Sequence, residues 1–410
     1  MSGKWPGGII SKTAPTVVGP TDGEGGSASG IWTLDQAADY EKQGLWPKPV
    51  IPRELWNCGS NDQGQLAQGN TTVRSSPVQI GALTDWPTVS SRDRSVSAIK
   101  SDGTLWSWGM NNVGQLGVGD TTNTSSPVQV GALTDWDKLA CGFQTTATIK
   151  TDGTMWLFGS GKYGALGDGT TVDKSSPVQM GALTTWSKIG YGYGAGIAIK
   201  TDGTLWTWGT NWYGQMGIGT SGNTYNSPNQ VGALTDWSFP TAGGGDVGFD
   251  LCVKTDGTLW AWGRNDKGQL GTNNTTDYSS PVQVGALTDW AEVQAGEDDW
   301  TAALKTDGTI WAWGEGSAGQ LGQGNTTDYS SPVQVGALTT WSKISTAYNI
   351  FYALKTDGTV WAWGAGNDGA LGQGNTTSYS SPVQVGALTT WMTLAKNSPS
   401  SSGFIGIKQP

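Results

Sequence analysis

The stretch Asp-Gly-Thr-Leu-Trp-Thr-Trp-Gly, at residues 202–209, decides the fold because the chain repeats it. Its core, Leu-Trp-x-Trp-Gly or a close relative, occurs seven times, almost always 50 residues apart. A fixed period of this size indicates one supersecondary unit copied along the chain. The first Trp of each copy is Trp56, Trp106, Trp156, Trp206, Trp260, Trp311 or Trp361.

Each unit predicts a hairpin around its Asp-Gly pair. In Ala-Ile-Lys-Thr-Asp-Gly-Thr-Leu-Trp, at 198–206, two short apolar runs flank the turn, and both Asp and Gly tolerate positive φ. The small-then-branched pair Ala198–Ile199 suits a crowded centre where neighbouring sheets converge. After the turn, the two Trp residues share one side of a strand, where large rings fill the wedge between adjacent sheets.

The remainder of the unit predicts the outer part of a blade. Gly-Gln-Leu-Gly follows the Trp motif, as at 114–117, and then comes Ser-Pro-Val-Gln-Val-Gly-Ala-Leu-Thr-x-Trp, as at 126–136. Pro is tolerated on an outer edge strand, where no N–H is needed. Such a unit holds four short strands, and four-stranded units repeated radially make a β-propeller. The predicted fold is therefore all-β, a propeller of seven four-stranded blades over residues 51–410.

The first Trp motif lacks the strand that should precede it, so the chain has six Asp-Gly hairpins for seven motifs. The chain ends with Gly-Phe-Ile-Gly-Ile-Lys at 403–408, which matches the missing strand. We therefore predict that strand 403–408 pairs beside strand 54–59. This pairing of the two ends closes the ring and leaves no open sheet edge.

Composition excludes several classes of function. The 64 Gly and 24 Trp among 410 residues favour large sheets with tight turns over a helical bundle. The net charge is −10 with no basic stripe, which argues against binding nucleic acid. The absence of His excludes His-based catalysis and His-ligated metals. Cys58, Cys141 and Cys252 have no metal-ligand spacing, and no cofactor is predicted.

Targeting signals are also absent from the sequence. Residues 1–20 lack the apolar core of a signal peptide, and no stretch is apolar enough to cross a membrane. These features predict a protein made and folded in a cytoplasm, without membrane insertion.

The pattern Asp-Gly-x-Leu-Trp-x-Trp-Gly-x-Asn-x-x-Gly-Gln-Leu-Gly-x-Gly, at 102–119 and largely again at 256–271, resembles the regulator of chromosome condensation repeat family. The resemblance covers about residues 51–410 and implies a seven-bladed propeller closed by strands from both termini. Functions in that family include nucleotide exchange on a small GTPase with chromatin contact, ultraviolet sensing and β-lactamase inhibition. This chain lacks the family's usual His before the hairpin and its basic tail, so exchange activity and chromatin binding are not predicted.

Residues 1–50 do not follow the repeat and are predicted to form an extended docking arm. Thr33-Leu-Asp-Gln36 is a capping-box signature, which predicts a short helix at about 34–43 with Gly44 as its stop. The segment 27–36 with Trp46-Pro47 is similar to short segments of bacteriophage virion and tail proteins, and a plain linker is the alternative. The apolar residues predicted to dock are Trp5, Ile9, Ile10, Ile31, Trp32, Leu34 and Trp46.

The repeats differ from one another mainly in the loop before the small-branched strand. Repeat symmetry places these loops on one face around the axis, where aromatic anchors with a polar surround are typical of binding surfaces. Unconstrained loops vary too, and that is the alternative. A second variable set follows the Trp motif and includes Trp212. The candidate binding residues in the loops are Arg92, Arg94, Phe143, Tyr191, Tyr193, Asp246, Phe249, Glu297, Asp298, Asp299, Trp300, Tyr348 and Phe351.

Together these patterns predict a non-enzymatic binding propeller on a bacteriophage particle, as a tail fibre, spike or capsid decoration. Residues 1–50 would bind other virion proteins, and the loop ring would bind a host surface protein or glycan. The expected location is a virion assembled in the host cytoplasm. The alternatives are a bacterial protein–protein interaction or inhibitor propeller and, as a weaker one, a carbohydrate-active enzyme using the 297–299 carboxylates. The same carboxylates could bind Ca²⁺, although no twelve-residue loop supports this.

Overall fold

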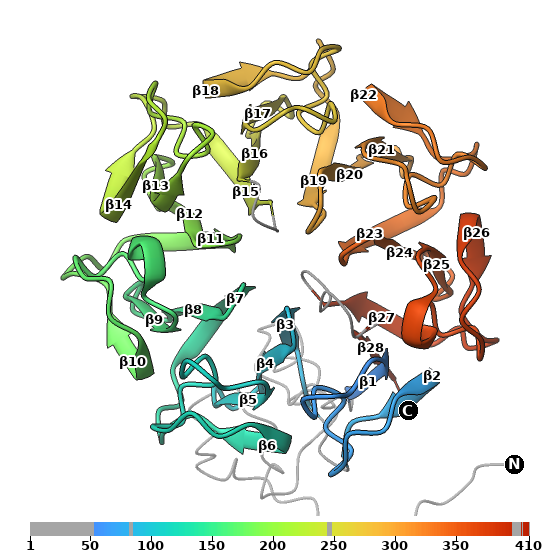
Figure 1. Ribbon diagram of the computed structural model, residues 1–410, viewed down its shortest axis with the longest axis horizontal. Helices are drawn as coiled ribbons and strands as arrows, with labels where there is room; N and C mark the ends of the chain where they lie inside the picture. The colour runs from blue at the N-terminus through green and yellow to red at the C-terminus, as the bar shows by residue number, and fades with distance from the viewer. Residues whose placement is uncertain (1–52, 82–84, 244–247, 396–402, 404, 410) are drawn as a thin grey trace, which may run out of the picture. The chain divides into compact units, whose positions relative to one another are not determined.

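The computed structural model describes residues 53–409 except 82–84, 244–247, 396–402 and 404. Residues Arg53–Pro410 form one compact unit, a ring of seven four-stranded antiparallel sheets arranged around an axis (Figure 1). The predicted arm at 1–50, its helix at 34–43 and its docking residues lie outside the described residues.

We number six blades in chain order from the innermost strand outward. Blade 1 holds β3 (Thr88–Arg92), β4 (Ser95–Ile99), β5 (Leu105–Gly109) and β6 (Thr124–Gln129), and blade 2 holds β7 (Trp136–Gly142), β8 (Thr145–Lys150), β9 (Met155–Gly159) and β10 (Lys174–Gln179). Blade 3 holds β11 (Trp186–Tyr191), β12 (Ala195–Lys200), β13 (Leu205–Asn211) and β14 (Asn223–Gln230).

The other blades repeat this order. Blade 4 holds β15 (Trp237–Ala242), β16 (Phe249–Lys254), β17 (Leu259–Gly263) and β18 (Tyr278–Gln283), and blade 5 holds β19 (Trp290–Ala295), β20 (Trp300–Lys305), β21 (Ile310–Gly314) and β22 (Tyr329–Gln334). Blade 6 holds β23 (Trp341–Thr346), β24 (Ile350–Lys355), β25 (Val360–Gly364) and β26 (Tyr379–Gln384). Two short 3₁₀ turns, η1 (Lys162–Gly164) and η2 (Asn367–Gly369), follow β9 and β25.

The closing blade joins the two ends of the described unit, as the sequence predicts. Its order is β27 (Trp391–Leu394), β28 (Ile405–Lys408), β1 (Glu54–Gly59) and β2 (Arg74–Gln79). Strands β1 and β28 are antiparallel, with Trp56 opposite Gly406. The Lys408 Nζ lies 2.9 Å from the Glu54 carboxylate, which locks the register of the pair.

Strands with Ser-Pro-Val-Gln lie at the outer edge of their blades, where the sequence places them. The small-then-branched strands do not lie at the centre. They are the second strands (Figure 1). The innermost strands begin at the Trp that ends the preceding unit, except in blade 1, where β3 begins two residues after Trp86. The sequence placed this strand one position too far inward because both strands are buried throughout most of their length.

The Asp-Gly turn uses a different geometry from the one expected. Only the glycine takes positive φ, 76° at Gly103, and the Lys100 N–H donates to Thr104 O across a three-residue loop. The Asp102 carboxylate accepts hydrogen bonds from the Thr104 N–H and hydroxyl. A side chain on Gly103 would clash with the Thr134 carbonyl of the neighbouring connection. The glycine is therefore required by both its conformation and its neighbour.

The second Trp of the motif fastens five of the blades to the blade before each of them, whereas blade 2 has Phe158 at this position. The Trp108 ring is fully buried, and its indole N–H donates to Gln65 O of the closing blade at 3.0 Å. Trp208, Trp262, Trp313 and Trp363 each make the equivalent bond to the preceding blade. The prediction that these rings fill the wedge between blades is confirmed.

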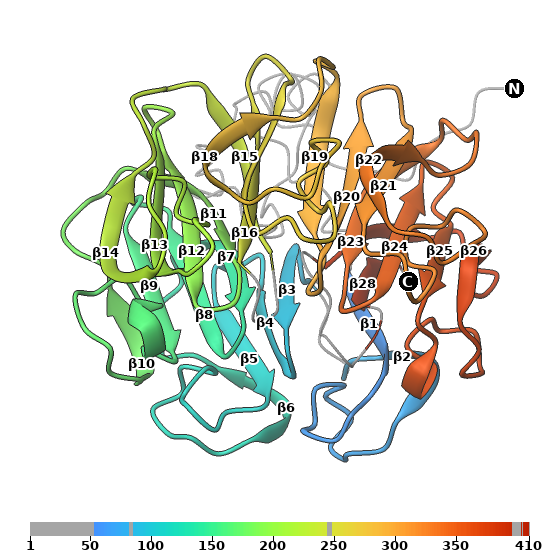
Figure 2. The same ribbon diagram turned by 45° about the horizontal axis from the view of Figure 1, so that its top comes forward.

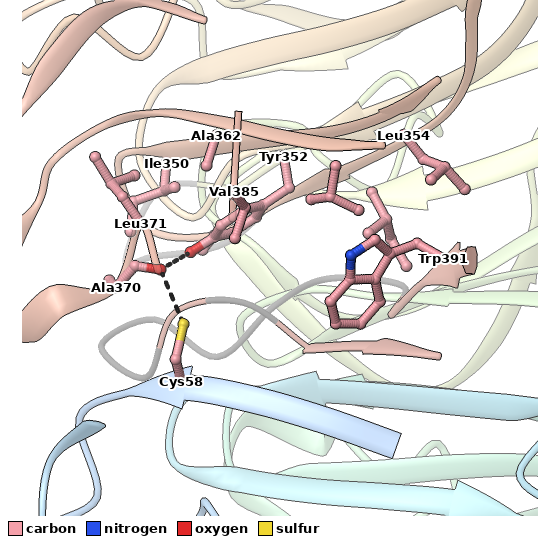
Figure 3. Packing of buried hydrophobic residues seen from close by; sticks show 12 residues of the cluster. Cys58, Ile350, Tyr352, Leu354, Ala362, Ala370, Leu371, Val385 and Trp391 are labelled. Atoms are coloured by element: carbon pink, nitrogen blue, oxygen red, sulfur yellow. Dashed lines mark hydrogen bonds between the residues drawn. The ribbon is translucent and has the colours of Figure 1, made fainter. Parts of the chain in front are cut away.

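Cys58 replaces this Trp at the seam between blade 6 and the closing blade (Figure 3). The Cys58 Sγ lies 3.7 Å from Ala370 O, which also accepts the Tyr352 hydroxyl at 2.9 Å. The smaller Cys58 side chain and the Tyr352 ring from blade 6 share one core cluster at this seam.

Candidate functional site: the loop face

Antiparallel strands place two loops of every blade on the same face of the ring, which we call the loop face (Figure 2). The inner loop joins the first and second strands, and the outer loop joins the third and fourth. The residue after the Trp motif ties the two loops together, as where the Met110 N–H donates to Arg94 O at 2.9 Å. The opposite face, which we call the turn face, carries the Asp-Gly turns and the Gly-Ala-Leu-Thr connections.

Arg92, at the end of β3, reaches across the axis of the ring. Its Nη1 donates to Tyr191 O of blade 3 at 2.6 Å and lies 3.4 Å from Ala242 O of blade 4. Its Nε lies 3.8 Å from the Glu297 carboxylate of blade 5. Only 1% of Arg92 is exposed. This side chain links four blades and is not available to a partner, which corrects its predicted place on the binding surface.

Several other candidate residues are also buried rather than exposed. Phe351 stacks on Trp363 with ring centroids 4.4 Å apart, and the Trp300 indole donates to Tyr348 O. These rings fill the wedge between blades at its loop-face end, so they belong to the core. The expectation of exposure is wrong for Tyr191, Phe249, Trp300, Phe351, Glu297 and Asp299, each less than 9% exposed.

Three of the remaining aromatic candidates lie in one partly exposed group over blades 2 and 3, which we call the aromatic sector. It consists of Phe143, Tyr163, Tyr193, Trp212 and Tyr213. The Phe143 and Tyr193 rings lie 4.7 Å apart, and the Tyr163 and Trp212 rings 4.8 Å apart. Trp212 and Tyr213 are the most exposed, at 37% and 36%.

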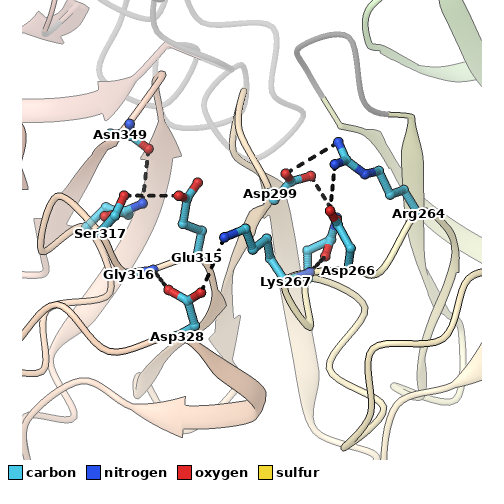
Figure 4. A network of polar contacts seen from close by, with 11 residues as sticks. Arg264, Asp266, Lys267, Asp299, Glu315, Gly316, Ser317, Asp328 and Asn349 are labelled. Atoms are coloured by element: carbon cyan, nitrogen blue, oxygen red, sulfur yellow. Dashed lines mark hydrogen bonds and ion pairs between the residues drawn. The ribbon is translucent and has the colours of Figure 1, made fainter.

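A group of carboxylates lies over blades 4 and 5, and Figure 4 labels Asp266, Asp299 and Glu315 of this group. This acidic sector consists of Asp266, Asp298, Asp299 and Glu315. Arg264 joins it to the aromatic sector, since its guanidinium lies over the Tyr213 ring and contacts Asp266 at 2.6 Å and Asp299 at 3.6 Å. The Gln269 side chain also donates to Asp299 at 2.7 Å.

The carboxylates of the acidic sector repel one another. Burial, followed by the negative charge of Glu315, raises the pKa of Asp298 to about 6. Burial also raises the pKa of Asp299 to about 7; Asp266 and Asp298 add to this rise, and Arg264 opposes it. The pair therefore takes up protons near neutral pH, well above the usual range of an aspartate.

We expect two carboxyl groups to titrate with midpoints near pH 6 and pH 7 in ¹³C NMR spectra of side-chain carboxyls. Because folding raises both pKa values, the stability of the folded state decreases as pH rises through these midpoints. The variant Asp299→Asn should lack the titration near pH 7. Its melting temperature should exceed that of the wild type by more at pH 8 than at pH 5. Carboxyls that all titrate below pH 5 would contradict this expectation.

Sequence reasoning missed Arg264, Asp266 and Glu315. Arg264 and Glu315 occupy the position after the Trp motif, which holds six different residue types in the seven copies. That variability was a usable signal, but it does not show that Arg264 meets a ring from the preceding blade. Among the other candidates, Arg94 pairs with Asp62 and Tyr348 is 47% exposed, while Asp246 lies outside the described residues.

Within the described residues, no group of His, Cys, Asp and Glu side chains is arranged to hold a metal ion. The three cysteines are buried and unpaired with one another. No helix in the described part of the chain is long and apolar enough to cross a membrane.

The chain matches the family model described as the regulator of chromosome condensation (RCC1) repeat. The matched residues are 102–149, 152–199, 202–245, 256–303, 307–354 and 357–395, together more than half of the chain.

Curated relatives share parts of this repeat region. The chain is 40% identical over 103 residues to the RCC2 homolog of Danio rerio and 36% identical over 114 residues to the ultraviolet-B receptor UVR8 of Arabidopsis thaliana. These segments cover 25% and 27% of the chain, and 21% and 26% of the respective relatives. The chain therefore aligns with only about a quarter of the length of either protein.

Solved structures agree with the fold. The chain superimposes on human WBSCR16 with a TM-score of 0.75 and 18% identity, covering 87% of this chain and 98% of that one. It superimposes on yeast RCC1 (Prp20), solved bound to Kap60, with a TM-score of 0.76 and 16% identity, covering 88% and 90%. At these identities the likeness establishes the fold alone.

The predicted role as a bacteriophage virion component is wrong. RCC2, UVR8 and the ubiquitin ligase HERC2, which this chain resembles, are eukaryotic proteins, and nothing in these matches points to a virion protein. The repeat signal was read correctly, but the resemblance of the short segment in residues 1–50 to virion proteins has no support. The predicted location follows from the same segment and stays an untested prediction.

Proposed function

The chain belongs to the regulator of chromosome condensation (RCC1) repeat family, and on that premise we propose that it is a protein-binding propeller whose loop face holds the partner. The observation that carries this proposal is the aromatic sector. It gathers two exposed and three half-buried rings from two blades at positions where the repeats differ from one another.

Exposed rings held in place are typical of protein interfaces. Aromatic side chains supply most of the energy of an interface when they sit near its centre within a polar surround. The Tyr163 ring packs beside the backbone of Gly194, which joins the Phe143–Tyr193 pair to the Tyr163–Trp212 pair. The sector is thus preorganised, which lowers the entropic cost of binding.

Two comparisons support a protein partner. Yeast RCC1 (Prp20) was solved bound to Kap60, and a second Prp20p structure is described together with binding to Gsp1p and histones. Those partners are proteins, and we transfer to this chain only the general property of binding a protein. Of the predicted alternatives, the protein–protein interaction propeller is the one that this proposal keeps.

The geometry does not favour a carbohydrate-active enzyme. A glycosidase places two carboxyl groups on opposite sides of the bond that it cleaves. Asp298 and Asp299 are successive residues, and Asp299 is held by Arg264 and Gln269. We therefore propose binding without catalysis at this face.

The variant Trp212→Ala should weaken partner binding about 30-fold, because loss of a central aromatic anchor costs about 2 kcal/mol or more. The partner would be recovered from a lysate of the source organism on immobilised chain, identified by mass spectrometry, and its affinity measured by calorimetry. Leu234→Ala is the matched control, since Leu234 is 47% exposed in the same blade but on the turn face. Equal affinities for the two variants would refute the loop face as the binding surface.

A further inference from the structure

We propose that a pocket beside Tyr348 on the loop face binds a basic side chain, Lys or Arg, of the protein partner. The inference rests on the proposed function and specifies the chemistry of the bound segment. The pocket has a volume of about 320 Å³ and lies between the inner loops of blades 1 and 6 and the outer loop of blade 6. Its lining includes Arg94, Tyr348, Ile350, Ala365, Asp368 and Ala370.

The shape and lining of the pocket suit a long side chain with a charged end. Ile350, Ala365 and Ala370 supply apolar surface for an aliphatic stem. Asp368, which is exposed, supplies a carboxylate for the cation at its tip. Lys and Arg bury their methylene stems on apolar surface while their charged groups keep polar contacts.

Asp368 occupies a repeat position whose side chain differs in chemical type between blades of the loop face. It is the middle residue of η2 with φ of 52°, and Tyr163 is the middle residue of η1 with φ of 61°. The same place in the repeat therefore presents a ring over blade 2 and a carboxylate over blade 6. The scaffold is shared, and the side chain at this one position differs.

Arg94 is the one cationic residue of the pocket lining, and it pairs with a carboxylate that does not belong to the lining. Its guanidinium pairs with Asp62 of the closing blade. The charge that Arg94 brings is thus largely balanced by a residue that does not line the pocket. Asp368 and the nearby Asp298 leave the surroundings of Tyr348 negative.

The exposed Tyr348 ring is well placed to meet a cation. Asp298, first among the causes, raises the pKa of the Tyr348 phenol, which is the response of an acid to a negative potential. The Tyr348 ring is 47% exposed, so its face is open to a guanidinium or ammonium group. Geometry and charge therefore favour a cation over a neutral or acidic group.

The pocket is connected to the aromatic sector through the acidic sector. Tyr213 contacts Arg264, Arg264 contacts Asp299, and Asp299 precedes the Trp300 whose indole donates to Tyr348 O. A partner segment with an apolar anchor at one end and a Lys or Arg at the other would therefore engage both ends of this path.

The test uses the small probes n-butylguanidinium and n-butylurea with the full chain labelled with 3-fluorotyrosine. The chain has 11 Tyr, and Tyr348→Phe assigns the Tyr348 signal in the ¹⁹F NMR spectrum. We expect saturable shifts of that signal with n-butylguanidinium at millimolar concentrations and none with the neutral, nearly isosteric n-butylurea. Asp368→Asn should lower the affinity for n-butylguanidinium several-fold. Raising the salt concentration from ~0.05 to ~0.5 M should lower that affinity further.

The matched control is Asp328→Asn, which removes an exposed carboxylate paired with Lys267 outside the pocket. It should leave the titration unchanged. Equal responses to the cation and to the urea, or equal weakening by the two Asn variants, would overturn the inference. The small probes need no protein partner, so the two tests are independent. If the probes do not bind, the prediction for Trp212→Ala is unaffected. If Trp212→Ala binds the partner like the wild type, the probe titration still tests the pocket.

Discussion

A chain that ends at Ser402 should fail to fold cooperatively, because it lacks β28, the second strand of the closing blade. Ile405 and Ile407 of β28 are each 1% exposed and pack in the core cluster that includes Trp86 and Trp108. Loss of two buried Ile side chains alone costs roughly 4–10 kcal/mol, which is comparable to the whole stability of many domains. Circular dichroism on heating, together with size-exclusion chromatography, would show the loss.

Point variants separate ring closure from a general effect of shortening the chain. Ile407→Asp places a charge in the same core and should behave like the truncation, whereas Ile407→Val should cost only about 0.5–1.5 kcal/mol. Gln409→Ala changes a residue beyond the strand and serves as the neutral control. A truncated chain that melts at the temperature of the full chain would show that the closing blade does not hold the ring together.

Arg92→Met should destabilise the protein by about 3–5 kcal/mol, because it removes one partner of a buried ion pair. The Glu297 carboxylate, on a residue that is only 8% exposed, would then lack its cationic partner. The Tyr191 carbonyl oxygen would also lose its hydrogen-bond donor at the axis. Chemical denaturation monitored by the fluorescence of the Trp residues measures the change.

Arg94 provides a control only two residues away. It forms an ion pair with Asp62, but both side chains are substantially exposed, so Arg94→Met should cost no more than about 1 kcal/mol. The double variant Arg92→Met with Glu297→Gln should recover part of the loss, because Glu297 is then no longer a buried charge without its cation. Equal losses for Arg92→Met and Arg94→Met would disprove the axial role of Arg92.

The fold could be predicted from the sequence because its determinants are local and repeated. The Trp spacing predicted the blades, and the missing hairpin before Trp56 predicted the pairing of β1 with β28. The order of the two inner strands was not predicted, since pattern alone does not rank two strands that are both buried. The phage assignment failed because it relied on a short segment outside the repeat.

The candidate site was predicted only in outline. Loop variability predicted that Trp212, Tyr193 and Tyr348 share one face of the ring, as they do, but it did not separate exposed rings from buried ones. Phe351 and Tyr348 are three residues apart in the same loop region, yet one stacks on Trp363 and the other faces solvent. That difference depends on contacts between blades, which sequence variation within one loop does not report.

The sharing of the closing blade between the two chain ends also sets the order of events on the ribosome. Strands β1 and β2 emerge first, but their sheet cannot be completed until Ile405–Lys408 has been synthesised. At ~5–20 residues per second, the early hairpin waits roughly 20–70 s with one edge unpaired. Blades 1–6 complete their own sheets as they emerge, so nascent chains are most exposed to mispairing at β1 during that interval.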